Sequence, residues 1–163
     1  MPPNASVQSR DLISNARLLL SSSKGKPSLV NLRRAVSAAY YALFHCLGRN
    51  CADLLIGGAG SNRSPEAWRQ VYRSLEHGLA KDRCKNIKMI EKFPQDIQDF
   101  ANLFVSMQEK RHSADYDPLE KFYKSAVSAD IEQVDLAVNA FNTVSAMDRR
   151  AFCAYVLLRE RKN

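Results

Sequence analysis

Residues 33–45 read Arg-Arg-Ala-Val-Ser-Ala-Ala-Tyr-Tyr-Ala-Leu-Phe-His, and this stretch decides the fold. Along it and just beyond it, apolar side chains recur at intervals of three and four, at Leu32, Val36, Ala39, Leu43 and Leu47. That spacing places them on one side of an α-helix, the side that packs into a core. Ser28 precedes this stretch and has the side chain of an N-cap residue. We therefore predict a central core helix that starts after Ser28 and runs to about Leu47.

The same helical period continues outward from this stretch, and no segment alternates apolar and polar residues over the length of a strand. The predicted fold class is all-α: an up-and-down bundle of four to five main helices with a basic C-terminal helical segment. Serine, proline and glycine mark where helices begin and end: Ser64 and Pro65 have the residue types of an N-cap and a first turn for the third helix, and Gly78 is expected to end it. The remaining helices are expected at about residues 6–20, 65–78, 81–91 and 94–111, with a further helix start at Asp117, Pro118 and Glu120 and a last long helix from Ser128.

Length and composition are those of one globular domain. The chain has 163 residues, 45% of them hydrophobic and 25% charged, which excludes disordered and collagen-like chains. No apolar run approaches the roughly 18–20 residues that cross a bilayer, and residues 1–10 lack the apolar core of a secretory signal. We expect a single domain over residues 1–163, with its core at about 6–146 and a basic segment at 147–163. We also expect a cytoplasmic location and no membrane partner.

The sequence contains no motif typical of a metal, cofactor or redox site. The cysteines form no CxxC pair and have no clustered histidines, so we expect reduced core thiols at Cys46, Cys51, Cys84 and Cys153. There is also no Gly-rich phosphate loop and no paired-carboxylate arrangement. We therefore predict no metal and no cofactor.

Charge is distributed unevenly along the chain, whose net charge is +7. Residues 1–93 carry fifteen basic and six acidic side chains, residues 94–147 carry four and nine, and residues 148–163 carry five and two. Such blocks can attract a polyanion to one part and a basic partner, or a second copy of the chain, to another. The basic balance alone is weak evidence for a nucleic-acid partner.

Arg34, Tyr41 and His45 share one face of the predicted central helix, because their spacings of seven and four return to the same side. One interpretation is a tightly packed helix whose tyrosine hydroxyls find partners at its edge. The other is a surface that binds a ligand or RNA through these three side chains. The residues alone leave both interpretations open.

Arg111 is conspicuous because it continues the apolar stripe of Phe104 and Met107 instead of opposing it. A charge in that position needs a partner, and Asp115 lies one helical turn later. The pair can be purely structural and fix the turn before Pro118. Alternatively, Arg111 and the adjacent His112 face a phosphate or the carboxylate of a partner.

Two basic clusters are further candidates for phosphate binding. Four lysines are spaced four, three and four residues apart and would form a ridge on one helix, at Lys81, Lys85, Lys88 and Lys92. The opposite, buried side of that helix would carry Cys84, Ile87 and Ile90. The C-terminal segment adds Arg149, Arg150, Arg159, Arg161 and Lys162. Either cluster can be an electrostatic footprint for RNA or simply a solvated face.

Two segments resemble prokaryotic HEPN-domain proteins. Residues 33–45 resemble the helix that reads Arg-Ala-x-Ser-x-Ala-Tyr-Tyr-Ala-x-Phe in that family, and residues 111–118, Arg-His-Ser-Ala-Asp-Tyr-Asp-Pro, resemble the segment in which an Arg precedes Ala-Asp-Tyr and a turn. The resemblance implies an all-α bundle, commonly paired as a homodimer. It also implies a connection with RNA cleavage, toxin–antitoxin pairs or antiviral defence, with a partner protein encoded nearby.

The ribonuclease branch of this family has an Arg followed after four to six residues by a His, and this chain departs from that signature. Tyr116, Asp117 and Pro118 stand where the His is expected, and Arg73 with His77 is a near match outside the family's site. The resemblance therefore favours a catalytically degenerate protein that binds RNA, a nucleotide or a partner protein. Two alternatives are a metal-independent endoribonuclease, with Arg111, His112 and Tyr116 as candidate catalytic residues, and a structural oligomerisation module.

Overall fold

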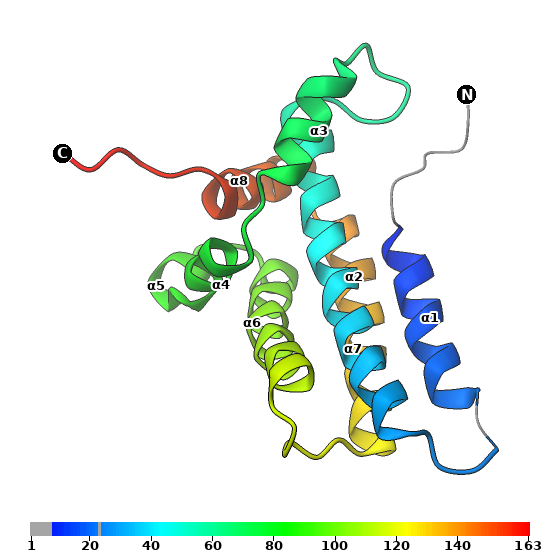
Figure 1. The fold of residues 1–163 in the computed structure, drawn as a ribbon. Coiled ribbons are helices and arrows are strands. Elements are labelled where there is room, and N and C mark those ends of the chain that lie inside the picture. Colours follow the sequence, from blue (N-terminus) through cyan, green and yellow to red (C-terminus); the bar gives the residue numbers. More distant parts are fainter. Residues whose placement is uncertain (1–7, 23) are drawn as a thin grey trace.

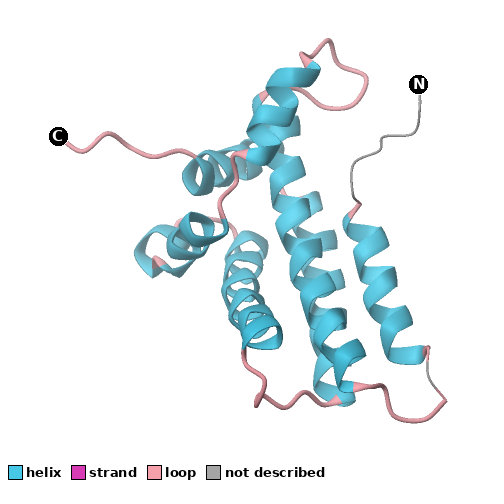
Figure 2. Cartoon of the chain, viewed as in Figure 1, coloured by secondary structure: helices cyan, strands magenta, loops and turns pink. Residues whose placement is uncertain are grey.

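The computed structural model describes residues 8–22 and 24–163. These residues form eight helices and no strand, so the predicted all-α fold class is confirmed (Figures 1 and 2). The helices are α1 (Ser9–Ser21), α2 (Leu29–Leu55), α3 (Pro65–Arg73), α4 (His77–Lys85), α5 (Ile87–Ile90), α6 (Gln95–Tyr116), α7 (Lys124–Thr143) and α8 (Ala146–Leu157). None of the described helices is both long enough and apolar enough to cross a membrane.

Four helices, α1, α2, α6 and α7, form an up-and-down bundle (Figure 1). Each runs opposite in direction to the one before it, and α2 packs against the other three. The short helices α3, α4 and α5 lie between α2 and α6 in the chain, and α8 follows α7 and packs on α2 and α4. Of the short helices, α3 therefore packs on α2, whereas α4 and α5 pack on α6.

Helix α2 is the centre of the core, as its periodicity predicted. All five residues of the apolar stripe are buried, from Leu32 to Leu47. Small side chains such as Ala35 and Ala39 are fully buried among them and let the neighbouring helices approach closely. Large side chains from α6, α7 and α8 complete the core, among them Phe100, Phe104, Phe141 and Phe152.

Serine side chains begin three of the helices. Ser28 accepts a hydrogen bond from the Asn31 amide at the start of α2, and Ser64 accepts one from Ala67 at the start of α3. Both caps were predicted. The Ser145 side chain accepts a hydrogen bond from the Asp148 amide and so begins α8 as a helix separate from α7.

Several predicted boundaries are wrong. Helix α2 continues to Leu55 instead of ending near Leu47, and Gly78 lies inside α4 instead of ending the third helix. The expected helix over 81–91 is two helices, because Asn86 ends α4 and accepts the Met89 amide to begin α5.

The expected helix start at Asp117 is also wrong. The Asp117 carboxylate accepts the Leu119 amide at 2.9 Å, and this local turn leads into a connection, not into a helix. The last long helix begins at Lys124, four residues before Ser128. Helix α1 covers most of the expected range, of which residues 6 and 7 lie outside the part described.

The C-terminal segment packs onto the bundle through α8. Phe152, Cys153 and Val156 are fully buried, whereas residues 158–163 are non-helical and exposed. The predicted basic C-terminal segment is therefore helical only as far as Leu157.

The opposed charge blocks meet within one chain. Arg10 and Arg17 of α1 both form ion pairs with Asp135 of α7, and Arg17 also pairs with Glu132 at 3.0 Å. Part of the acidic block is thus neutralised by α1, which weakens charge complementarity as a reason to expect a second copy.

Candidate functional site

Arg111 lies near the end of α6 with its side chain only 17% exposed. Its Nε is 2.9 Å from a carboxylate oxygen of Asp115, and its Nη2 donates a hydrogen bond of 3.0 Å to the Tyr41 hydroxyl. The guanidinium carbon also lies 5.4 Å from the Tyr41 ring centre and 5.8 Å from that of Tyr40, within cation–π range. The expected Arg111–Asp115 pair is present, and Tyr41 fixes the guanidinium from the other side.

Asp115 connects this pair to α2. Its second carboxylate oxygen accepts a hydrogen bond of 2.8 Å from the Ser37 hydroxyl. Ser37 and Tyr41 are one helical turn apart, so the same face of α2 holds both Arg111 and the carboxylate that orients it. Two helices distant in sequence thereby position one cation.

His77, the first residue of α4, lies against the other side of the tyrosines. Its Nδ1 shares a hydrogen bond of 2.6 Å with the Tyr40 hydroxyl, and its ring stacks on Phe44 with centroids 3.9 Å apart. The His77 and Tyr41 ring centres are 5.9 Å apart. Arg111 and His77 therefore contact the same two tyrosines from different helices.

Burial lowers the pKa of His77, and the positive charge of Arg111 and the neighbouring His45 lower it further. The pKa of His45 is lowered by burial as well. His45 Nδ1 forms a short hydrogen bond with the Tyr72 hydroxyl of α3. Both imidazoles are thus favoured in their neutral form, in which one ring nitrogen accepts a proton.

A shallow groove of about 480 Å³ opens beside Asp115. Arg34, Ser37, Asp115 and Tyr116 line it, together with Val30 and Arg33. Arg33 is structural, because its guanidinium donates to the carbonyl oxygens of Ala114 and Glu120 and so caps the end of α6. Arg34 and Tyr116 are exposed, and the Tyr116 ring lies 4.9 Å from that of His112 on the outer face of α6.

The residues predicted on one face of the central helix separate into two environments. Tyr41 and His45 are half-buried among Arg111, His77 and Tyr72, whereas Arg34 is exposed in the groove. The packed interpretation therefore describes Tyr41 and His45, whereas binding of a ligand or RNA by this face stays a prediction.

The lysine ridge is interrupted. Lys81 forms an ion pair of 3.4 Å with Glu109 of α6, and the break at Asn86 places Lys85 and Lys88 on separate helices. Lys85, Lys88 and Lys92 are exposed. Ile87, expected on the buried side opposite the lysines, is 74% exposed, so that expectation is wrong.

The C-terminal arginines also have partners within the chain. Arg149 donates to Asn50 and to the Val144 carbonyl, and Arg150 donates to the Leu54 carbonyl at 3.2 Å. Arg159 pairs with Glu76 at 3.2 Å. These contacts attach α8 and the segment after it to the bundle and leave a smaller basic surface than the sequence indicates.

The four cysteines are buried thiols, in agreement with the sequence. Burial raises the pKa of Cys46 and of Cys84 to about 12, so both are protonated at neutral pH and poor nucleophiles.

Sequence reasoning missed His77 as a member of this site. The Arg73–His77 spacing drew attention to it, but nothing local shows that the first residue of α4 contacts Tyr40 and Tyr41 of α2. Tyr40 and Tyr72 were missed as hydrogen-bond partners for the same reason. His112, a candidate from the sequence, faces outward beside Tyr116.

Comparisons of the chain with protein-family models, with curated proteins and with solved structures found no match. The resemblance of residues 33–45 and 111–118 to HEPN helices thus stays a prediction. The function has to be argued from the geometry of the Arg111 site.

Proposed function

We propose that this chain is a HEPN-like protein that binds single-stranded RNA, with one phosphate at Arg111 and neighbouring nucleotides along the groove beside Asp115. The observation that carries the proposal is the fixed guanidinium. Asp115 and Tyr41 hold Arg111 from two sides and orient it before any ligand arrives. A pre-oriented arginine loses little side-chain entropy when it binds a phosphate.

The groove supplies the other elements of single-strand recognition. Arg34 adds an exposed cation beside the largely buried Arg111, and Tyr116 adds an aromatic ring that is 67% exposed. Bases of single-stranded RNA stack on such rings, while the backbone follows positive charge. In line with the resemblance, we propose a role in a prokaryotic toxin–antitoxin or defence context, with a homodimer and a partner protein encoded nearby.

A metal-independent endoribonuclease is the second candidate, and the position of His77 favours it. In such a reaction a base removes the proton of the ribose 2′-hydroxyl, the 2′-oxygen attacks phosphorus, and the bond to the 5′-oxygen breaks as that oxygen takes up a proton. The lowered pKa of His77 keeps its ring unprotonated at neutral pH, as a base requires. In this candidate Arg111 stabilises the added negative charge on phosphate, and His77 supplies the imidazole that the sequence lacks after Arg111.

Binding is tested by fluorescence anisotropy with a labelled unstructured RNA at low salt. We expect Arg111→Gln to weaken binding about tenfold or more, since a charge-assisted bond to phosphate is lost. Lys110→Gln is the matched control, because Lys110 is adjacent in sequence and pairs with Asp130 at 2.7 Å on the α7 side. Equal affinities for the wild type and the Arg111→Gln variant would contradict the proposal.

Cleavage is tested by incubating the same RNA in EDTA. The endoribonuclease candidate predicts products with cyclic phosphate ends that disappear in both His77→Gln and Arg111→Gln. Binding without cleavage would retain the RNA-binding proposal and exclude the second candidate.

A further inference from the structure

A second polar cavity lies beside the last two turns of α2, near its junction with α8. It has a volume of about 370 Å³ and is lined by side chains from α1, α2, α7 and α8. The polar residues that matter are Arg10, Arg49, Asn50, Asp53, Asn142 and Arg149. The groove beside Asp115 shares none of them.

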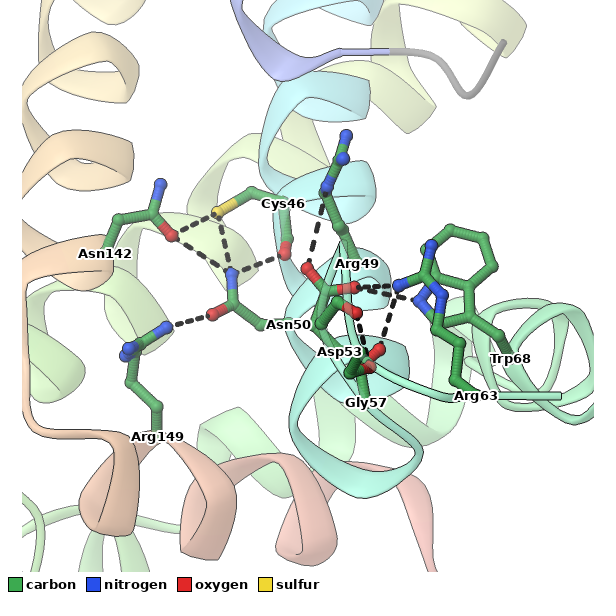
Figure 3. Close-up of polar contacts among 11 residues, drawn as sticks. Cys46, Arg49, Asn50, Asp53, Gly57, Arg63, Trp68, Asn142 and Arg149 are labelled. Carbon is green, nitrogen blue, oxygen red and sulfur yellow. Dashed lines mark hydrogen bonds and ion pairs between the residues drawn. The ribbon is translucent and has the colours of Figure 1, made fainter. Parts of the chain in front are cut away.

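Asn50 organises this cavity (Figure 3). It is the buried polar residue of α2, at 7% exposure, and its amide nitrogen donates to the Cys46 carbonyl at 2.8 Å and to the Asn142 side chain at 3.1 Å. Its amide oxygen accepts a hydrogen bond of 2.8 Å from Arg149. One buried amide therefore fixes two polar side chains on the cavity wall, one from α7 and one from α8.

Arg149 keeps donors for a ligand after these contacts. Its Nε donates to the Val144 carbonyl at 2.8 Å, and one Nη donates to Asn50. Within the described part of the chain, the Arg149 side chain makes these two hydrogen bonds. They use fewer than half of the five N–H donors of a guanidinium.

The cavity carries excess positive charge. Three arginines and one aspartate line it: Arg10, Arg49, Arg149 and Asp53. The excess persists when the ion pairs formed within residues 8–22 and 24–163 are included, because Asp135 and Glu132 are accompanied by Arg17, and Asp53 is shared with Arg63 at 3.1 Å. Five arginines then stand against three carboxylates.

We infer that this cavity binds a small phosphorylated ligand no larger than about a mononucleotide. Guanidinium donors that line a pocket match the oxygens of a phosphate group. The volume is near the lower limit of about 300 Å³ for small-molecule sites, which is too small for a polymer. The site is independent of the RNA-binding proposal, and either can fail without the other.

The test is isothermal titration calorimetry of the full chain with adenosine monophosphate, ribose phosphate, inorganic phosphate and uncharged adenosine. We expect one phosphorylated ligand per chain and no heat from adenosine. Arg149→Gln and Arg10→Gln should each weaken binding about tenfold. The two simpler phosphates distinguish recognition of the whole nucleotide from recognition of the phosphate alone.

Arg17→Gln is the matched control, because Arg17 lies on the same helix as Arg10 and pairs with the same Asp135 but does not line the cavity. The affinity of the Arg17→Gln variant for the phosphorylated ligand should stay within about twofold of the wild-type affinity. If Arg149→Gln does not fold, Arg10→Gln decides the question, because the Arg10 side chain is 54% exposed. Absence of binding by all three phosphates at millimolar concentration, or an equal loss in Arg17→Gln and Arg10→Gln, would overturn the inference.

Discussion

Arg111 links two helices of the candidate site, because its guanidinium contacts Asp115 of its own helix and Tyr41 of α2. Its place on the stripe of Phe104 and Met107, both fully buried, indicated a charge that needs a partner. Asp115, one turn later, is that partner. Tyr41 and His77 come from helices that only tertiary packing brings together, so no local pattern reveals them.

Replacement of Arg111 should destabilise the fold moderately. Arg111→Ala removes the partner of Asp115 and the donor to Tyr41, and we expect a loss of about 1–3 kcal/mol in the free energy of unfolding. The loss falls short of that for a fully buried pair, because the Asp115 side chain is 32% exposed. Urea denaturation measures it, with the exposed neighbour His112→Ala as a control expected within about 0.5 kcal/mol of the wild type. Equal stability of the two variants would show that Arg111 contributes nothing to the fold.

Stability should fall as the pH is lowered through the range in which free histidine titrates. The pKa values of His45 and His77 are lowered from 6.5 in the folded chain, mainly by burial. Below that pH the unfolded chain therefore binds more protons than the folded chain, which favours unfolding. The stability due to the neutral rings is complete above about pH 6.5 and is lost as the pH falls through the lower pKa of the folded state. Thermal melts between about pH 7.5 and 5 should show this loss.

A histidine variant assigns this dependence to the candidate site. His77→Gln should flatten the pH dependence of the melting temperature, because His77 is one of the two half-buried rings whose pKa is lowered. An identical pH dependence in the wild type and His77→Gln would contradict the assigned role of His77.

At the scale of helices, the sequence predicted cores and caps better than ends. The stripe from Leu32 to Leu47 and the caps at Ser28 and Ser64 follow from local spacing and local hydrogen bonds, which is why they could be predicted. The end of α2 could not, because its last turns are held by tertiary hydrogen bonds of Asn50 with Asn142 and Arg149, which no local pattern reveals. The prediction at Asp117 was wrong for a different reason. The Asp117 carboxylate does accept the Leu119 amide, as at a helix start, but the chain continues as a non-helical connection.

Asn50 should hold α8 against α2 and α7. Asn50→Ala leaves Asn142 and Arg149 without their partner, and we expect a loss of about 2–4 kcal/mol in the free energy of unfolding. Hydrogen exchange should show faster exchange of α8 amides than of α6 amides in this variant. Asn139→Ala is the control, because exposed Asn139 contacts only Asp135 of its own helix among the described residues. Unchanged α8 protection would contradict the role of Asn50.

At the scale of the whole molecule, the bundle exposes apolar side chains at one end. Leu29 and Val30 at the start of α2 lie with Tyr116 and Pro118 around one hollow, and Leu119 beside them is 86% exposed. A contiguous exposed apolar patch commonly marks a protein interface. The opposite end of the bundle is closed by α3 and α8.

We predict that the chain forms a homodimer through Leu29 and Leu119 at this end, and that the Tyr116 ring, which the RNA-binding proposal needs, stays outside the interface. Sedimentation should give about twice the chain mass of 18.4 kDa. Leu119→Glu should yield a folded monomer, whereas Leu136→Glu, at an exposed position on α7, should remain dimeric. A wild-type chain that sediments as a monomer at tens of micromolar would contradict the predicted homodimer.

The central claim is that RNA binds at the Arg111 site and not at the basic clusters elsewhere. Photo-crosslinking with thiouridine-substituted RNA, followed by peptide mapping, tests it most directly, because it reports position as well as affinity. We predict crosslinks in the peptides that contain Tyr41 and Tyr116, and their loss in Arg111→Gln. Crosslinks confined to residues 81–92 or 149–162, or unchanged in Arg111→Gln, would contradict the claim.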